Sequence, residues 1–173
     1  MKKKASSFKK CTLLIAFADL SSFLKHAAKC TDLELMAFLQ SYYDFAGEII
    51  EKAGGTVIKC IGDALLITFP ESKADAGVKA LIKLKIDGDK WLEKKKSPCR
   101  NNIKVHFGPV AVGEIGPDGG RRHDIIGNAV NTAAQIRSPG MAVTTQAFEA
   151  LTPATKKLFL KYTPQITYNL IEK

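Results

Sequence analysis

The stretch from Thr56 to Phe69, TVIKCIGDALLITF, constrains the fold more than any other part of this 173-residue chain. Two runs rich in β-branched and apolar residues flank Gly62–Asp63, and Pro70 follows the second run. This pattern predicts a β-hairpin with Gly62–Asp63 at its tip. Because a hairpin pairs its strands in antiparallel fashion, the pattern excludes a doubly wound sheet made only of parallel strands.

Helical and strand-like patterns alternate along the rest of the chain. Apolar residues recur at helical spacing from Leu33 to Ala53, after an N-cap at Thr31 or Asp32 and before the glycine pair 54–55. Further helices are predicted over residues 20–29, 71–96, 127–137 and 145–151. Strands are predicted over residues 11–18, 123–126 and 141–145, with a strand pair at 102–114 that turns at Gly108–Pro109 and two short strands at the end. This order predicts an α+β fold with a mostly antiparallel sheet and helices on one face.

The composition is that of one globular domain. The chain is 46% hydrophobic and 25% charged, and no internal repeat or linker divides it. We therefore expect a single domain over residues 11–173, preceded by a basic tail over residues 1–10.

A formal net charge of +9 favours an anionic partner. The tail, MKKKASSFKK, holds five lysines and no acid, and without it the net charge falls to +4. We interpret the tail as solubilising, with contact to a membrane surface as the less favoured alternative. The tail and a second basic run, Lys94–Arg100, lack the interleaved series of aromatic residues on which bases stack, so we expect no nucleic-acid partner.

Export and membrane insertion are not predicted. The apolar stretch at residues 13–18 is short, and no apolar run approaches the ~18–20 residues that span a bilayer. The four cysteines form no C-x-x-C pair, and the three histidines have no metal-ligand spacing. The expected compartment is therefore the cytoplasm, where thiols stay reduced.

Two carboxylates interrupt apolar runs at the ends of predicted strands. Asp19 ends the first strand, and Asp63 lies at the hairpin tip. If these strands are neighbours, the carboxylates converge, and converging carboxylates repel one another unless they share a cation. Mg²⁺ is then a natural partner, because it binds through one or two carboxylates. The alternative is a pair of turn-forming aspartates without a ligand.

Other features suit a phosphorylated ligand. The loop Leu20–Phe23 leads from a strand into a helix N-terminus, whose free N–H groups suit phosphate, although the Walker A pattern is absent. Lys59 shares a predicted strand face with apolar neighbours and therefore needs a partner or a ligand. Asn131 and Gln135 lie on one helical stripe, for which a solvated surface is the alternative interpretation.

Four segments in order resemble the hallmark segments of class III adenylate/guanylate cyclases. They are FADLSSF, GGTVIKCIGDALLITF, IKVHFGPVAVGEIG and HDIIGNAVNTAAQI, and the resemblance covers roughly Thr12 to Ser138. It implies a ferredoxin-like core and a head-to-tail homodimer with active sites formed between two subunits. It also implies conversion of ATP to cyclic AMP and pyrophosphate by two-metal-ion catalysis.

The resemblance implies roles for single residues on one side of each shared site. Asp19, Asp63 and the Leu20 carbonyl would hold two divalent cations, Mg²⁺ or Mn²⁺. The loop formed by Leu20, Ser21, Ser22 and Phe23 would bind the triphosphate.

The other chain would complete the site. Lys59 and Asp124 would recognise adenine, since Lys59 can donate to a ring nitrogen and Asp124 can accept from the exocyclic amine. Asn131 would orient the ribose. Further phosphate contacts are expected from Arg121 or Arg122 and from Lys161.

Gln135 departs from the family pattern, which usually has an arginine four residues after the ribose asparagine. Glutamine donates a hydrogen bond but brings no charge, and a catalytic arginine can be worth ~10³–10⁵ in rate. On a continuous helix Arg137 would point about 200° away and could not substitute. Three functions therefore stay open. They are a slow adenylate cyclase, a catalytically silent domain that binds nucleotide and dimerises, and, as the least favoured, a nucleic-acid binder that uses a ferredoxin-like sheet and positive charge.

Overall fold

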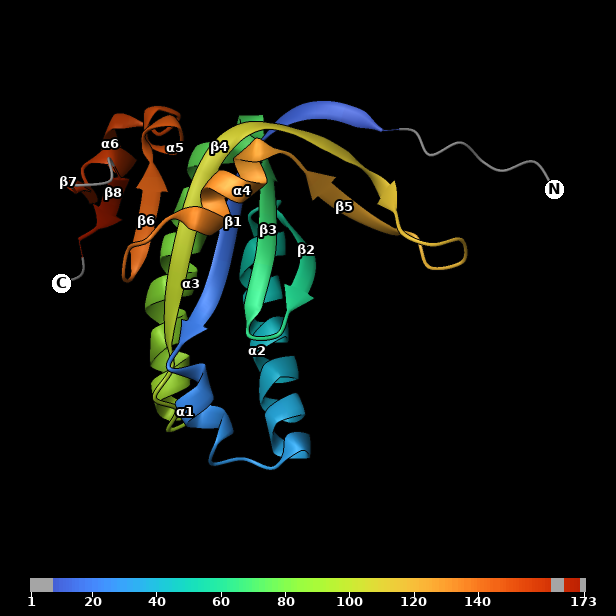
Figure 1. Cartoon of the computed structure of the whole chain (residues 1–173). Helices are drawn as coiled ribbons and strands as arrows, with labels where there is room; N and C mark the ends of the chain where they lie inside the picture. Colours follow the sequence, from blue (N-terminus) through green and yellow to red (C-terminus); the bar gives the residue numbers. More distant parts are fainter. Residues whose placement is uncertain (1–7, 163–166, 172–173) are drawn as a thin grey trace.

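The computed structural model describes residues 8–162 and 167–171. One eight-stranded sheet runs through this part of the chain in the order β2-β3-β1-β4-β6-β8-β7, with β5 paired to β4 (Figure 1). The strands are β1 (Lys9–Ser21), β2 (Thr56–Ile61), β3 (Ala64–Pro70), β4 (Arg100–Ile115), β5 (Arg122–Ile126), β6 (Met141–Thr144), β7 (Phe159–Tyr162) and β8 (Thr167–Leu170). The helices are α1 (Phe23–Ala27), α2 (Asp32–Lys52), α3 (Ala74–Lys94), α4 (Asn128–Gln135), α5 (Thr145–Glu149) and α6 (Pro153–Lys156), with a 3₁₀ turn at Glu71–Lys73.

The α+β prediction with a mostly antiparallel sheet is confirmed. Among the strand pairs of the described residues, only β4 and β6 run parallel. The hairpin is confirmed as well, because Ile61 pairs with Ala64 and leaves Gly62–Asp63 as a two-residue turn. Gly62 has φ of 59°, a left-handed conformation that favours glycine. The Tyr43 hydroxyl of α2 donates a hydrogen bond to the Gly62 carbonyl and holds the turn against the helix.

The turn expected at Gly108–Pro109 is wrong. Both residues lie inside β4, where Gly108 pairs with Leu13 and Pro109 with Thr12 of β1. A side chain at Gly108 would meet the Cβ of Ala129 at 3.0 Å. The glycine therefore marks the close approach of α4 to the strand rather than a reversal of the chain.

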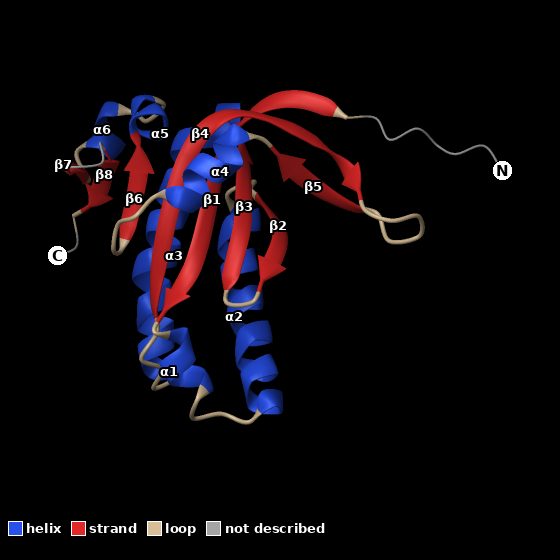
Figure 2. Cartoon of the chain, in the orientation of Figure 1, coloured by secondary structure: helices blue, strands red, loops and turns tan. Residues whose placement is uncertain are grey.

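The helices cover both faces of the sheet, so the expectation that they share one face is also wrong. Helices α2 and α3 pack on one face, and α4 lies on the other (Figure 2). The face of α2 and α3 buries Leu14 and Ala16 of β1 in the larger core. The alternate residue Ile15 points to the opposite face and packs in a smaller cluster with Ala129 and Ala133 of α4.

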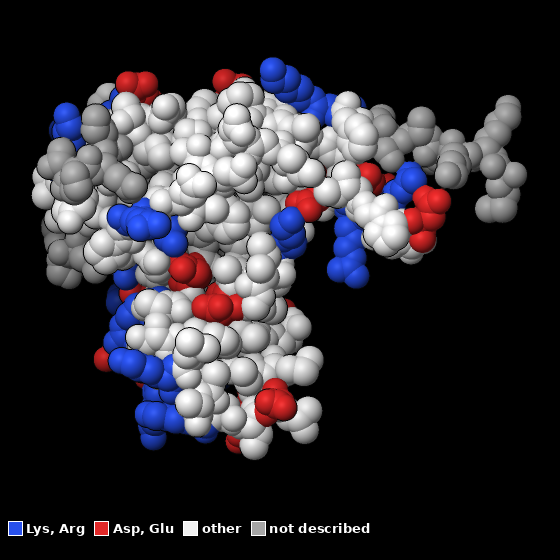
Figure 3. All heavy atoms as spheres, in the orientation of Figure 1, with Lys and Arg blue, Asp and Glu red and all other residues white. Residues whose placement is uncertain are grey.

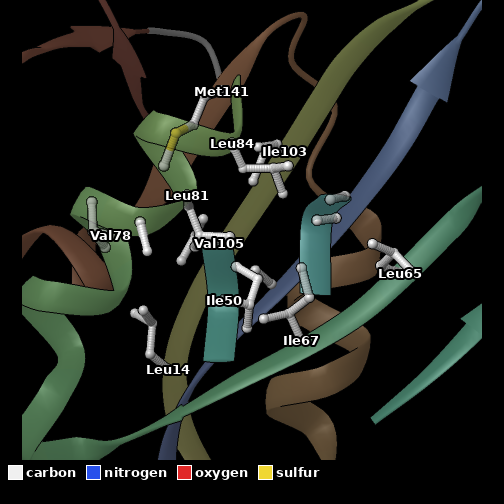
Figure 4. Close-up of a cluster of buried hydrophobic side chains, with 14 of the residues drawn as sticks. Leu14, Ile50, Leu65, Ile67, Val78, Leu81, Leu84, Ile103, Val105 and Met141 are labelled. Atoms are coloured by element: carbon white, nitrogen blue, oxygen red, sulfur yellow. The ribbon is translucent and has the colours of Figure 1, made fainter. Parts of the chain in front are cut away.

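The larger core joins the sheet to α2 and α3 (Figure 4). Leu65 and Ile67 of β3 pack with Ile50 of α2, and Val105 of β4 lies beside Leu81 of α3. These side chains are fully buried, and each contributes roughly 1.5–3 kcal/mol of transfer free energy relative to an exposed position.

Several predicted boundaries shift. Strand β1 begins at Lys9, so Lys9 and Lys10 of the expected tail belong to a paired strand, while residues 1–7 lie outside the described residues. Helix α1 is only Phe23–Ala27, α4 stops at Gln135, and the expected helix 145–151 ends at Glu149. Thr31 is confirmed as the N-cap of α2, where it forms a capping box with Glu34.

No helix among the described residues is both long enough and apolar enough to span a bilayer.

Two helical glycines provide a matched test of how closely α3 approaches the sheet. A Cβ at Gly77 would lie 2.6 Å from the Phe69 ring and 2.9 Å from Leu14, whereas a Cβ at Gly47 of α2 has no neighbour within 4 Å. We expect Gly77→Ala to lower the free energy of unfolding by about 1–3 kcal/mol through overpacking. Gly47→Ala should raise it by about 0.5–1 kcal/mol, because alanine favours a helix. Urea unfolding of both variants tests this, and equal effects would contradict the packing.

Candidate nucleotide and metal site

Asp19 and Asp63 come together, as the sequence predicts. Ala18 of β1 pairs with Leu65 of β3, so the end of β1 lies beside the β2–β3 turn that carries Asp63. Burial raises the pKa of Asp19 above its ordinary value, and the Asp63 charge raises it further, while Lys104 opposes the shift. Figure 3 shows two neighbouring acidic side chains on the face that carries α4, with basic side chains on both sides of them. The ionised pair is therefore electrostatically unfavourable without a cation.

Two oxygens in this region suit a divalent cation. Asp19 Oδ1 and Asn102 Oδ1 are buried and have no hydrogen-bond partner within the part of the chain that the structure describes. Asp19 and Asn102 are paired directly across β1 and β4, so their side chains project from the same face of the sheet. Buried oxygens without partners are costly unless a ligand satisfies them. The donor set, hard oxygen atoms with one or two carboxylates, fits Mg²⁺ or Mn²⁺.

The protein supplies only part of a coordination shell. Within residues 8–162 and 167–171, no group of three or more His, Cys, Asp and Glu side chains lies together. Two carboxylates and neutral oxygens would leave positions for water or for a phosphate group, which is how Mg²⁺ sites that bind nucleotides are built.

The loop after Asp19 presents backbone N–H groups. Ser22 has φ of 61° and ψ of 18°, a left-handed conformation that is uncommon for a serine, and it precedes the first residue of α1. Leu20 is buried, and Ser21 Oγ donates to the Arg100 carbonyl at 3.2 Å. In the first turn of α1, the N–H groups of Lys25 and His26 donate to the Ser22 carbonyl at 3.0 and 3.3 Å, which leaves those of Phe23 and Leu24 without an acceptor within the helix. The loop is therefore shaped to accept anionic oxygens.

A buried polar network supports this loop from the other face of the sheet. Asn101 pairs with Leu20 across β1 and β4. Its side chain accepts from the Tyr42 hydroxyl at 2.6 Å and donates to Asp89 at 3.0 Å, and Asp89 forms an ion pair with Lys85 at 2.6 Å. Burial, and then the charges of Asp19 and Asp89, raise the pKa of Tyr42 and keep it a hydrogen-bond donor. The network joins α2, α3 and β4 beneath the end of β1 that carries Asp19.

Lys59 and Asp124 meet in the same chain. Lys59 Nζ donates to Asp124 Oδ2 at 2.6 Å, joining β2 to β5. Asp124 is largely covered, whereas the Lys59 side chain is 43% exposed. Among the described residues, no hydrogen bond or ion pair links this pair to Asp19 or Asp63. One chain thus holds a donor and an acceptor side by side, paired with each other and not with its own carboxylate pair.

Helix α4 carries the remaining candidates. Asn131 and Gln135 are exposed on α4, while Ala129 and Ala133 bury its other side. The helix ends at Gln135, and buried Ile136 is extended with ψ of 122°, so Arg137 follows an extended segment. Gln135 and Arg137 both line one cleft, and because the helix ends between them, the angle of about 200° expected on a continuous helix does not apply to this pair.

The expected phosphate contacts do not gather at this site. Arg121 forms an ion pair with Asp118 at 2.8 Å in the β4–β5 loop, and Arg122 is exposed at the start of β5. Lys161 is exposed on β7, at the far edge of the sheet.

Asn102 and Lys104 are the residues that the sequence interpretation missed. Lys104 Nζ lies 3.7 Å from Asp19 Oδ2, and its side chain is 18% exposed. The signal was present in β4, where residues 102, 104 and 106 alternate with buried Ile103 and Val105 and must share the other face.

The sequence is similar to proteins of one family. The model of the adenylate and guanylate cyclase catalytic domain matches residues 4–167. An adenylate cyclase of Anabaena cylindrica is 28% identical over 140 residues, which cover 76% of this chain and 28% of that protein. The receptor-type guanylate cyclase gcy-23 of Caenorhabditis elegans is 28% identical over 142 residues, covering 78% of this chain and 13% of that protein. The chain thus spans less than a third of the length of these two relatives.

The fold is shared with solved cyclase structures. The adenylyl cyclase CyaB from P. aeruginosa superposes with a TM-score of 0.83 at 19% sequence identity, covering 96% of this chain and 97% of that one. This likeness confirms the cyclase type of α+β fold that the sequence predicts.

The raised pKa of Asp19 predicts how pH affects stability. The ionised form of Asp19 is less favourable in the fold than in the unfolded chain. Below the ordinary pKa of 3.8, Asp19 is protonated in both states and does not change the free energy of unfolding. As the pH rises from 3.8 through the raised pKa, ionisation of Asp19 lowers the free energy of unfolding. Without metal at neutral pH, Asp19→Asn should therefore unfold at a higher temperature than the parent, and this advantage should disappear at acid pH.

Thermal unfolding in a chelator across pH, with the exposed Asp44→Asn as the matched control, measures this effect. Adding Mn²⁺ should stabilise the parent but not Asp19→Asn. A lower unfolding temperature for Asp19→Asn at neutral pH would show that the carboxylate is not strained there.

Proposed function

The chain belongs to the family of adenylate and guanylate cyclase catalytic domains, and from that premise we propose that it converts ATP to cyclic AMP and pyrophosphate at sites shared by two copies. The observation that carries the proposal is that one chain holds two groups of candidate residues, and no hydrogen bond or ion pair joins these groups among the described residues. Asp19 and Asp63, with the loop after them, form one group, and the Lys59–Asp124 pair forms the other. A head-to-tail homodimer would bring the first group of one copy to the second group of its partner.

The Lys59–Asp124 pair supports adenine as the base. Lys59 Nζ donates and Asp124 Oδ2 accepts, and these two atoms already lie at hydrogen-bonding distance from each other. Adenine presents a ring nitrogen acceptor next to an amino donor and so matches this order, whereas the O6 acceptor of guanine would face the Asp124 carboxylate. Relatives of both kinds match the chain, so the preference for ATP rests on this pair.

The remaining residues bind and position the substrate. Asp19, Asp63 and the Leu20 carbonyl would hold two divalent cations, Mg²⁺ or Mn²⁺, with Asn102 Oδ1 beside them. When bound, these cations would supply two-metal chemistry, which stabilises the attacking and leaving oxygens of an in-line displacement. The N–H groups of the loop from Leu20 to Phe23 would bind the triphosphate.

Helix α4 of the partner would act on the ribose. Asn131 would orient the sugar so that its 3′-oxygen lies in line with the α-phosphorus, since positioning supplies much of the catalysis in such reactions. Gln135 would donate a hydrogen bond near the transferring phosphate but no charge. A slow rate is therefore part of the proposal, because one transition-state donor is typically worth ~10²–10³.

A turnover assay with Mn²⁺ and ATP tests the proposal. We expect cyclic AMP from the parent chain, more product from ATP than from GTP, and a loss on the order of 10²-fold or more in Asp63→Ala. Product at the Asp63→Ala level, with metal-dependent ATP binding intact, would instead identify a silent nucleotide-binding domain.

Mixing two inactive variants tests whether the sites are shared. Asp19→Ala and Asn131→Ala damage opposite sides of each site, so a heterodimer keeps one site with both sides intact. An equal mixture should regain about a quarter of the parent activity if subunits pair at random in a two-fold dimer. Absence of recovery, with heterodimers present by native mass spectrometry, would place both residues in the same site of one chain.

A further inference from the structure

A pocket lies between α3 and the C-terminal strands β7 and β8. Its volume is about 580 Å³, within the ~300–1,000 Å³ that is typical of small-molecule sites. Among the described residues, no candidate for the nucleotide site lines it. Its apolar lining comes from two distant parts of the chain: Ile82 and Ile86 of α3, Leu158 just before β7, Leu170 at the end of β8, and Ile171.

This apolar lining reaches from the core to solvent. Ile82 and Leu170 are partly buried and pack against the larger core. Ile86, Leu158 and Ile171 are 47%, 43% and 41% exposed. Single exposed apolar side chains are ordinary on a protein surface, but a group of them marks a place where something binds. A ligand in the pocket would remove this apolar surface from water.

The walls of the pocket are held by hydrogen bonds within the chain. The Ile171 N–H donates to the Leu158 carbonyl at 2.9 Å, and the Leu158 N–H donates to the Thr155 carbonyl at 3.0 Å. On the α3 side, buried Lys85 donates to Asp89 at 2.6 Å. The pocket is therefore formed without a ligand, as most small-molecule sites are, and binding would order little of the chain.

The charge at the pocket is positive. Among the described residues, Lys85, Lys90 and Lys157 line it against one carboxylate, Asp89. The charge of Asp89 is already balanced, since it accepts from Lys85 and, at 2.7 Å, from the Asn101 N–H. The ammonium groups of Lys90 and Lys157 are different, because neither has a hydrogen-bond or ion-pair partner in the described part of the chain.

We propose that this pocket binds a small amphiphilic carboxylate, for which a medium-chain fatty acid is the simplest form. The hydrocarbon chain lies on the apolar lining, and the carboxylate accepts from Lys90 and Lys157. Each CH₂ group that leaves water contributes to affinity, and hydrogen bonds between ammonium and carboxylate are among the strong ones. The inference does not depend on the proposed function, because the pocket and the nucleotide site share no candidate residue.

A bilayer surface and a segment of another protein are the alternative occupants. A stable protein partner covers ~800 Å² on each side, and a membrane-bound protein presents an extended basic and apolar face. A pocket of about 580 Å³ instead matches one small molecule. Two unpaired lysines at an apolar pocket favour a molecule with one anionic end.

Titration of the ¹⁵N-labelled chain, followed by amide chemical shifts, measures affinity and locates the site. The probes are hexanoate, octanoate, octan-1-ol and octylammonium, without nucleotide or metal. Octanoate should bind about 15-fold more tightly than hexanoate, as expected for two further buried CH₂ groups. Octylammonium has the same chain with the opposite charge and should bind about 10-fold or more weakly than octanoate. The largest shifts should fall on α3 around Ile86 and on residues 157–158 and 170–171.

Two kinds of variant test the two halves of the site. Lys90→Met with Lys157→Met removes the exposed charges and should weaken octanoate binding about 10-fold or more, but not octan-1-ol binding. Lys83→Met is the matched control, because Lys83 is an exposed lysine of α3 outside this pocket.

Ile86→Glu places a carboxylate within the apolar lining and should abolish octanoate binding. Leu33→Glu, at an exposed apolar position of α2, is its control and should bind like the parent. Circular dichroism checks that each variant folds, and either kind of variant is sufficient if the other does not.

Several results would overturn the proposal. Equal affinity for octanoate and octylammonium would mean that the lysines do not select an anion, and equal affinity for hexanoate and octanoate would mean that no chain is buried. Unchanged octanoate binding in the folded variants would place the ligand elsewhere. No octanoate binding, together with binding to phosphatidylserine vesicles that Ile86→Glu abolishes, would assign these residues to a bilayer surface instead.

Discussion

The antiparallel ladder between β1 and β4 is the constraint on which the rest of the structure depends. It pairs all thirteen residues of β1, from Lys9 to Ser21, with β4. Because side chains alternate, burying Leu14 and Ala16 against α2 and α3 forces Ile15 and Asp19 onto the face of α4. If the register of β1 shifted by one residue, Leu14 and Ala16 would exchange faces with Ile15 and Asp19. The burial of the core therefore fixes the face on which the site lies.

The site at the end of this ladder is electrostatically unfavourable by itself. Asp19 is half-buried, Asp63 lies close to it, and buried oxygens of Asp19 and Asn102 lack hydrogen-bond partners among the described residues. Lys104 offsets only part of this cost at 3.7 Å. The stable core therefore holds the two carboxylates in an electrostatically unfavourable position unless water or a cation binds to them. Such local conflicts are characteristic of ligand sites.

The chain holds its candidate residues in two groups rather than one. The carboxylate pair lies where β1 meets the β2–β3 turn, whereas Lys59 and Asp124 join β2 to β5 and α4 carries Asn131. For a cyclase domain this division favours a site completed by a second copy.

The sequence by itself determined what depends on local pattern. The hairpin at Gly62–Asp63 and the capped helix after Thr31 follow from periodicity and turn chemistry. The convergence of Asp19 with Asp63 was expected only if their strands are neighbours, and the pairing of β1 with β3 meets that condition. Only the tertiary structure decided what depends on neighbours distant in sequence. Gly108 looks like a turn residue until α4 is seen to pack against it, and Lys104 looks like a surface lysine until β1 places Asp19 beside it. The physical reason is that strand pairing and helix packing are non-local, so they set which face a residue occupies and which charge it meets.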